Sequence, residues 1–198
     1  MSQATCLLGI DCRLGTEEGS MGLLGWILLV TGVLVGLFVL SVIIGALLPK
    51  GHVVSRSLKS QAPPEKIWQV ISDFPNVPTW HPEVIQVERL PDRHGQEVWR
   101  ETYKGGHLMK LETTQRLPPR RLVRAIADEK GPFTGCWEFE IMAVAEGSRI
   151  TITEKGAISN PLIRLIFRLF MKPAVYLEKY LQALATKFGE AGVVEAEG

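Results

Sequence analysis

The stretch WQVISDFPNVPTWHP, residues 68–82, decides how the soluble part of this chain folds. It begins as an amphipathic helix, because Pro64 and Glu65 form a favourable helix start and Trp68 and Ile71 continue an apolar face. Prolines at positions 75, 78 and 82 then exclude a longer helix. The loop carries Trp80 beside His81, so it either closes a binding site or fills a core.

Strand patterns lie on both sides of this stretch. The predicted strands cover residues 53–59, 84–90, 97–103, 107–117, 121–128, 136–144 and 149–156, separated by Gly- and Pro-rich turns. Asn160 and Pro161 then predict the start of a long helix that ends near Gly189, with a kink at Pro173. One antiparallel sheet followed by a terminal helix predicts an α+β fold in which the helix covers one sheet face.

The N-terminal part has a different composition. Residues 22–48 contain no charged side chain and are long enough to span a bilayer as a helix. The alternative is a cleaved signal peptide, but its apolar core is usually only ~7–15 residues long. We therefore expect a disordered N-terminal tail at 1–20 and a transmembrane helix at 21–48. A ligand-binding domain at 49–190 and a C-terminal tail at 191–198 should follow.

Basic residues predict the orientation of this span. Lys50, Arg56 and Lys59 follow it, whereas only Arg13 precedes it, which favours a single-pass protein with its domain on the cytoplasmic side. A start at Met21 would strengthen the same assignment. Gly32 and Gly36 form a G-x-x-x-G motif, whose close helix approach would allow a homodimer; the alternative is that these are ordinary glycines, which are common in membrane helices.

Several functional classes are disfavoured. A formal net charge of +1 argues against a nucleic-acid-binding protein. The three cysteines, Cys6, Cys12 and Cys136, form no C-x-x-C pair, and no histidine has the spacing of a metal motif. The four histidines are therefore interpreted as surface or loop residues. P-loop, G-x-S-x-G and G-x-G-x-x-G motifs do not occur, and we expect no cofactor.

The chain resembles the SRPBCC superfamily, which includes the START, Bet v 1 and polyketide cyclase/dehydrase families. The resemblance covers residues 52–190 and is carried by APPEKIWQVISDF (62–74), Trp80, the strand order and YLQAL (180–184). It implies a helix-grip fold, with a curved antiparallel sheet of about seven strands gripping the C-terminal helix around an apolar cavity. The resemblance also implies a lipid-like or polycyclic ligand, but no fixed catalytic set.

Charged residues alternate in phase with apolar ones on the sheet face predicted to be covered. Glu101 lies between Trp99 and Tyr103, and Arg124 and Glu154 alternate with Ile126 and Ile152. Two acids and one base cannot pair fully, so a leftover neutral carboxyl would hold a ligand oxygen. Alternatively, these residues lie at strand ends in water, or the register is shifted by one.

The predicted ligand-binding residues combine this face with the loop and the C-terminal helix; they are Trp80, Trp99, Glu101, Tyr103, Arg124, Trp137, Phe139, Ile152, Glu154, Ile166, Phe170 and Leu177. Arg164, Arg168 and Lys172 form a basic edge on the same helix, interpreted as solvated or in contact with lipid headgroups.

The sequence thus predicts a membrane-anchored binding protein for a hydrophobic small molecule or lipid, with no assigned catalytic residue and no metal. One alternative is a cyclase or dehydratase, whose acid–base pair would come from Glu101, Asp128, Glu154 and Tyr103. Another alternative is an accessory factor that docks on a membrane-associated enzyme, as some carbon monoxide dehydrogenase accessory proteins of this superfamily do.

Overall fold

The structure is a computed structural model that describes residues 22–128 and 131–196. It divides into two compact units, one ending at Leu40 and the other covering Ser41–Gly198. The expected N-terminal tail, with Cys6, Cys12 and Met21, lies outside the described residues.

The apolar segment forms helix α1, Leu23–Leu47. It is the one helix among the described residues that is long and apolar enough to cross a membrane, and its side chains are not buried by the rest of the chain. This exposure distinguishes α1 from the core helix of a soluble protein. Its length and composition suit a membrane anchor, and a signal sequence near an N-terminus has similar properties.

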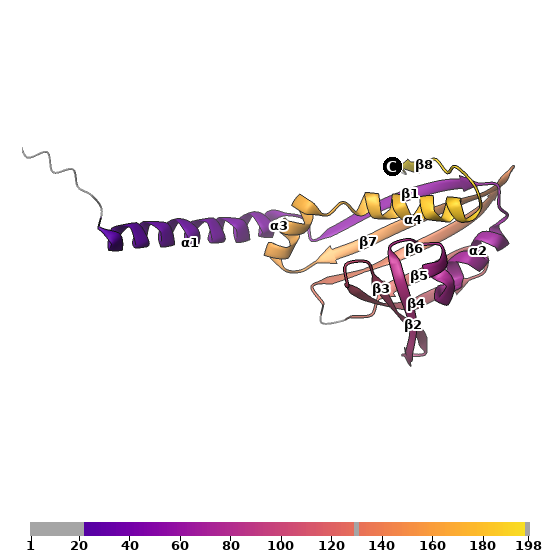
Figure 1. Ribbon diagram of the computed structural model, residues 1–198, viewed down its shortest axis with the longest axis horizontal. Coiled ribbons are helices and arrows are strands. Elements are labelled where there is room, and N and C mark those ends of the chain that lie inside the picture. Colours follow the sequence, from indigo (N-terminus) through magenta and orange to yellow (C-terminus); the bar gives the residue numbers. More distant parts are fainter. Residues whose placement is uncertain (1–21, 129–130, 197–198) are drawn as a thin grey trace, which may run out of the picture. The chain divides into compact units, whose positions relative to one another are not determined.

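The second unit is built on an eight-stranded antiparallel sheet (Figure 1), with strand order β2-β3-β4-β5-β6-β7-β1-β8. The sheet confirms the predicted strands; they are β1 (Gly51–Ser60), β2 (Val84–Arg93), β3 (Gln96–Tyr103), β4 (Leu108–Leu117), β5 (Arg121–Ile126), β6 (Phe133–Val144) and β7 (Gly147–Ile158). The eighth strand, β8 (Val194–Ala196), pairs with β1 and uses residues of the segment predicted to follow the domain. The α+β helix-grip fold is therefore confirmed.

Two helical regions cover the concave side of the sheet. Helix α4 (Pro173–Lys187) buries Leu177, Leu181 and Leu184 against the sheet. Helix α2 (Pro64–Ser72) and the short 3-10 helix η1 (Phe74–Thr79) pack into the same core. The opening stretch therefore fills core with Phe74 and Val77, both of which are buried.

The C-terminal helix is broken where a kink was predicted. Asn160 caps helix α3 (Pro161–Phe170), and its Oδ1 accepts the backbone N–H of Leu162 at 2.9 Å. Pro173 then begins α4 as a separate helix, because proline fits the first helical position but lacks the N–H needed inside a helix. Because of this break, the axis of α3 does not have to continue that of α4.

The interpretation of Arg164 as part of an exposed basic edge is wrong. Arg164 is only 3% exposed. Its guanidinium donates hydrogen bonds to the carbonyl oxygens of Gly45 (3.0 Å), Leu48 (2.9 Å), Ile158 (3.0 Å) and Ser159 (3.0 Å). The physical reason is that the last turn of α1 leaves backbone carbonyls without helical partners, and a cation at a helix C-terminus satisfies them.

Candidate functional site

The sheet register places the predicted polar residues on one face. Arg124 on β5 pairs opposite Trp137 on β6, and Trp137 pairs opposite Glu154 on β7. Glu101 on β3 and Arg124 are 4% and 7% exposed. A register shifted by one residue would have placed them in water, so the predicted face is correct for both residues.

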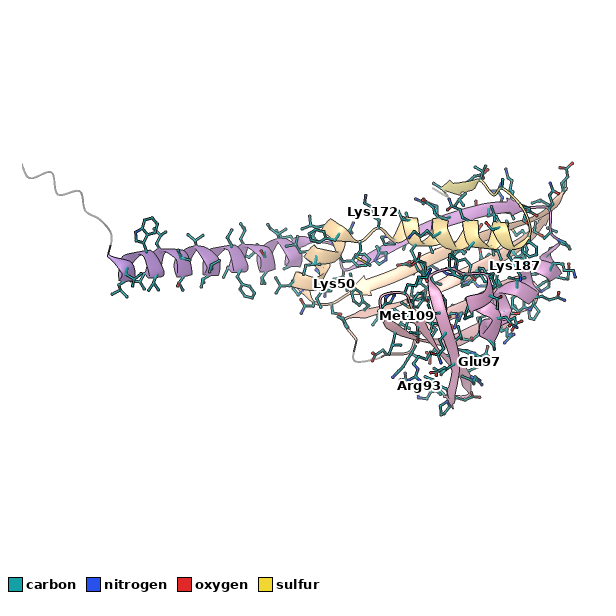
Figure 2. All side chains as sticks on the ribbon, viewed as in Figure 1. Lys50, Arg93, Glu97, Met109, Lys172 and Lys187 are labelled. Carbon is teal, nitrogen blue, oxygen red and sulfur yellow. The ribbon has the colours of Figure 1, made fainter. Side chains whose placement is uncertain are left out.

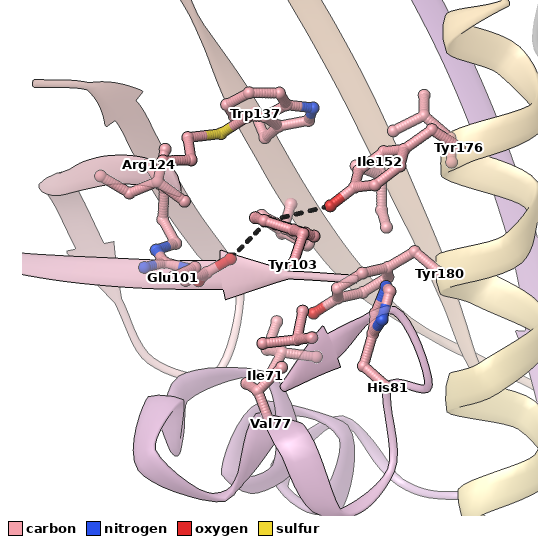
Figure 3. A pocket seen from close by; sticks show the side chains of 15 residues that line it. Ile71, Val77, His81, Glu101, Tyr103, Arg124, Trp137, Ile152, Tyr176 and Tyr180 are labelled. Atoms are coloured by element: carbon pink, nitrogen blue, oxygen red, sulfur yellow. Dashed lines mark hydrogen bonds and ion pairs between the residues drawn. The ribbon is translucent and has the colours of Figure 1, made fainter. Parts of the chain in front are cut away.

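A cavity of about 40 Å³ lies between this face, α4 and the η1 region (Figure 3). That volume accommodates about three water molecules. Its walls are mostly apolar and aromatic, with a few polar side chains; they consist of Ile71, Val77, His81, Val84, Glu101, Tyr103, Met109, Leu111, Arg124, Trp137, Phe139, Ile152, Tyr176, Leu177 and Tyr180.

Four of these residues form a hydrogen-bonded network inside the cavity. Arg124 Nη1 donates to Glu101 Oε1, and the Tyr103 hydroxyl donates to Glu101 Oε2 at 2.5 Å. The Tyr176 hydroxyl donates to that of Tyr103 at 3.1 Å. Dashed lines in Figure 3 mark the hydrogen bonds of Tyr103 with Glu101 and with Tyr176. The guanidinium of Arg124 also stacks 4.1 Å from the ring centroid of Phe74. Both carboxylate oxygens of Glu101 are therefore held by the protein itself.

Burial keeps the phenols of the cavity neutral. Desolvation raises the pKa of Tyr103, and the neighbouring Glu101 carboxylate raises it further. Burial is also the main cause that raises the pKa of Tyr176 and of Tyr180. All three hydroxyl groups therefore remain protonated at neutral pH and can donate hydrogen bonds.

His81 lies in a loop between η1 and β2, as predicted, but it is not at the surface. His81 is 1% exposed, lines the cavity and contacts the rings of Trp80 and Tyr180. Its Nδ1 accepts the backbone N–H of Glu83 at 3.2 Å. Burial lowers the pKa of His81, so the ring is neutral. Since Nδ1 is the acceptor, this hydrogen bond assigns the proton to Nε2.

Two lining residues have donors that remain unused. His81 Nε2 and the Nε and Nη2 atoms of Arg124 are buried and have no hydrogen-bond partner within the described part of the chain. Buried polar groups are normally paired, because an unpaired donor costs about 1–3 kcal/mol. Both groups are N–H donors, so the cavity is suited to an oxygen acceptor, such as a carbonyl, carboxylate or hydroxyl oxygen.

Seven of the predicted ligand-binding residues line the cavity: Glu101, Tyr103, Arg124, Trp137, Phe139, Ile152 and Leu177. Trp80 packs edge-on against Tyr180, and Trp99 packs against Phe74, so both support the walls from behind. Ile166 and Phe170 are exposed on α3 instead. The break before Pro173 causes this difference, because it ends the apolar stripe that a continuous helix would have directed toward the sheet.

Glu154 does not line the cavity itself but contacts Trp137, which does. Its Oε2 accepts the Trp137 Nε1–H at 3.0 Å, and its Oε1 lies 3.0 Å from His52 Nε2. The sequence argument counted two acids and one base and missed His52, which lies on β1 next to β7. Glu154 is therefore not the leftover carboxyl that the charge count predicted.

The sequence analysis did not assign His81, Tyr176 or Tyr180 to the ligand site. Tyr176 and Tyr180 are four residues apart on α4, so they share a helix face, and this spacing was a usable signal. His81 had no comparable signal, because its burial depends on the path of η1. The described residues contain no cluster of three His, Cys, Asp or Glu side chains that could hold a metal ion.

Comparisons with known proteins agree with this geometry. The family model described as "Polyketide cyclase / dehydrase and lipid transport" matches residues 51–189. Among curated proteins, none matches the chain.

Solved structures share the fold at low sequence identity. The Zhui aromatase/cyclase from Streptomyces sp. R1128 has a TM-score of 0.58 and 14% identity, over 69% of this chain and 93% of that chain. A START superfamily protein from Mycobacterium smegmatis has a TM-score of 0.51 and 17% identity, over 69% of this chain and 96% of that chain. These similarities establish the fold of the second unit.

The buried charge pair yields a stability prediction. Arg124→Met should destabilise the full-length chain by roughly 3–5 kcal/mol, because Glu101 is then left buried without its cation. Adding Glu101→Gln to that variant should restore most of the loss, since the glutamine is neutral and can still accept from Tyr103. Chemical unfolding in detergent measures both variants. Equal losses in the single and double variants would contradict the assignment of the loss to an unpaired Glu101 carboxylate.

A second prediction concerns His81 and pH. Its pKa is below its ordinary value of 6.5 in the folded protein, so the unfolded chain takes up this proton first as the pH falls. His81 therefore makes the folded state less stable as the pH drops below about 6.5. The loss of thermal stability between pH 7.5 and 5.0 should be smaller for His81→Gln than for the wild type.

The matched control for this experiment is His94→Gln, at the exposed β2–β3 turn. It should lose as much stability as the wild type over the same pH interval. An unchanged pH dependence in His81→Gln would contradict the neutral, buried state of this histidine.

Proposed function

The chain belongs to the polyketide cyclase / dehydrase and lipid transport family, and from this membership we propose that it is a membrane-anchored binding protein for a hydrophobic small molecule or lipid. The observation that carries the proposal is the cavity, which combines apolar and aromatic walls with unused N–H donors on Arg124 and His81. Such a site favours a lipophilic molecule that carries at least one acceptor oxygen.

The charge of the cavity supports the same ligand class. Glu101 neutralises Arg124, so the site offers directed N–H groups but little net charge. A carbonyl or hydroxyl oxygen therefore fits without the cost of burying an additional ion. The hydroxyl protons of Tyr103 and Tyr176 are used within the protein, by Glu101 and by Tyr103 respectively, so these phenols contribute polar oxygen atoms beside an apolar ligand body.

The cavity volume adds a requirement for motion. Sites that enclose drug-sized ligands measure roughly 300–1,000 Å³, whereas this cavity measures about 40 Å³. A lipid or polycyclic ligand therefore has to displace side chains of the wall. Tyr176 and Tyr180 are the large residues that α4 contributes, and η1 forms the opposite wall. Binding and a shift of α4 against η1 are thus coupled in this proposal.

A cyclase or dehydratase is the second candidate. It is favoured by the presence of unused donors in the cavity, because an N–H group of Arg124 or His81 can polarise a ligand carbonyl oxygen. The general base is the weaker part of this candidate. Glu101 is already bonded to Arg124 and Tyr103, Asp128 is exposed, and Glu154 does not line the cavity. We therefore rank binding above catalysis.

Membrane anchoring belongs to the same proposal. Helix α1 is apolar throughout, and the basic residues Lys50, Arg56 and Lys59 follow it, so we place the second unit on the cytoplasmic side. A Cβ added at Gly32 or Gly36 would meet open space, so these glycines remain free to approach a second copy. The homodimer stays a prediction from the motif.

Ligand binding is testable by native mass spectrometry of the full-length chain extracted from its membrane. We expect a co-purifying lipophilic molecule on the wild type. Ile152→Phe adds volume inside the cavity wall, at a cost of roughly 1–3 kcal/mol. The amount of bound molecule should therefore fall about tenfold.

The matched control is Ile85→Phe, the same chemical change at an exposed position of β2. It should leave the bound molecule in place. A wild-type chain without any bound molecule, or equal occupancy in Ile152→Phe, would contradict the proposal.

Orientation is a separate prediction. A fluorescent protein fused to the C-terminus should mature in the cytosol, whereas a reporter that works only in the periplasm should remain inactive. The physical reason is the excess of basic residues after α1. Activity of the periplasmic reporter at the C-terminus would place the domain on the other side of the membrane.

A further inference from the structure

Helix α3 presents an apolar face to the surroundings of the second unit. Leu169 is 65% exposed and Phe170 is 75% exposed, and Ile166 and Met171 are exposed as well. Ile166, Leu169 and Phe170 are three and four residues apart, so they share one face of the helix. A cluster of large apolar side chains on one helix face marks an interaction surface.

The position of α3 within its unit is fixed by the last turn of α1. A Cβ added at Gly45 would lie 2.1 Å from the carbonyl oxygen of Pro161, so the two backbones are in direct contact. Arg164 joins the same segments through the carbonyl oxygens of Gly45 and Leu48. Gly45 lies three residues before the end of the apolar segment at Leu48. Since a helix rises about 1.5 Å per residue, the start of α3 contacts α1 about 4.5 Å along the helix axis before that end.

Exposed apolar residues also continue from α3 onto this part of α1. Ile43, Ile44 and Leu47 lie in the second unit and are exposed. If α1 spans a bilayer, these three residues lie at its boundary. The face of α3 is then at the level of the same boundary, because the Arg164 hydrogen bonds and the Gly45 contact hold it there.

The segments of the chain that carry this surface have charges of one sign. Residues 22–64 and 155–177 contain no Asp or Glu. Arg168 and Lys172 are exposed on α3 and directly after it, and Lys50 is exposed just beyond α1. A helix with apolar residues on one side and basic residues beside them suits the boundary of a bilayer that contains anionic lipids.

We propose that the α3 face formed by Ile166, Leu169, Phe170 and Met171 docks onto the bilayer that α1 spans, as a second membrane contact. This inference rests on the proposed membrane anchor. A bilayer is favoured over a protein partner because the exposed apolar surface is continuous with the end of α1, and a lipid boundary must surround that end in any case. Arg168 and Lys172 then lie among the headgroups.

Spin labelling of the full-length chain in vesicles tests the proposal. The starting protein carries Cys6→Ser, Cys12→Ser and Cys136→Ser, and single cysteines are introduced by Leu34→Cys, Phe170→Cys and Gln182→Cys. The vesicles contain phosphatidylcholine and phosphatidylglycerol at a high lipid-to-protein ratio. Accessibility to oxygen, which concentrates in the bilayer, is compared with accessibility to a water-soluble nickel chelate.

The three positions separate the outcomes. We expect the labels at positions 34 and 170 to be accessible to oxygen and protected from nickel, and the label at 182, on the exposed side of α4, to show the reverse. A label at 170 as accessible to nickel as the one at 182, with 34 in the bilayer, overturns the docking of α3 alone. A label at 34 in water overturns the anchor itself.

A contact with a second copy would produce a different signal. Two labels at position 170 that face each other broaden each other's spectra, and dilution with unlabelled chain removes the broadening. Such broadening would overturn the bilayer as the occupant of this face. Its absence, together with protection from nickel in vesicles that hold no other protein, supports the docking of α3 on lipid.

Discussion

The ion pair between Glu101 and Arg124 is the constraint around which the interior of this domain is organised. Both side chains lie under α4, where water does not compensate their charges. Removing an ion from water costs several kcal/mol even after the protein relaxes, so each of the two needs the other and further hydrogen bonds. Tyr103 supplies one such bond to Glu101, and Phe74 offers its ring face to Arg124. Much of the polar chemistry of the cavity is built around this pair.

The pair also sets what the cavity can recognise. Glu101 uses both oxygens within the protein, while Arg124 keeps two donor atoms without a partner. A fully satisfied carboxylate beside an incompletely satisfied guanidinium makes the site a donor site. His81 adds to this character because the backbone N–H of Glu83 fixes its proton on Nε2. Three elements, β3, β5 and the segment after η1, thus contribute polar side chains to the cavity (Figure 3).

The sequence predicted the sheet well because strand alternation is a local property. The same alternation placed Glu101 and Arg124 correctly, since a strand's two faces follow from residue parity alone. The errors arose where distant segments decide the environment. His81 is buried because η1 turns it toward α4, Arg164 is buried because the end of α1 needs donors, and His52 meets Glu154 only through the pairing of β1 with β7. None of these partners is visible in a local pattern.

The polar residues behind the cavity wall connect it with α3. The ring of Phe167 lies 5.1 Å from that of His52, His52 lies against Glu154, and Glu154 accepts the indole N–H of Trp137 in the wall. His52 is confined in this row, because a Cβ on Gly156 would lie only 2.3 Å from its ring. Figure 2 shows the described side chains on the ribbon, with Lys50 and Lys172 among those labelled. This row of contacts runs from Phe167 on α3 to Trp137. Trp137 is part of the cavity wall, and Arg164 on α3 donates to the carbonyl oxygens of Gly45 and Leu48, so α3 contacts both the end of α1 and the row of side chains that reaches the cavity.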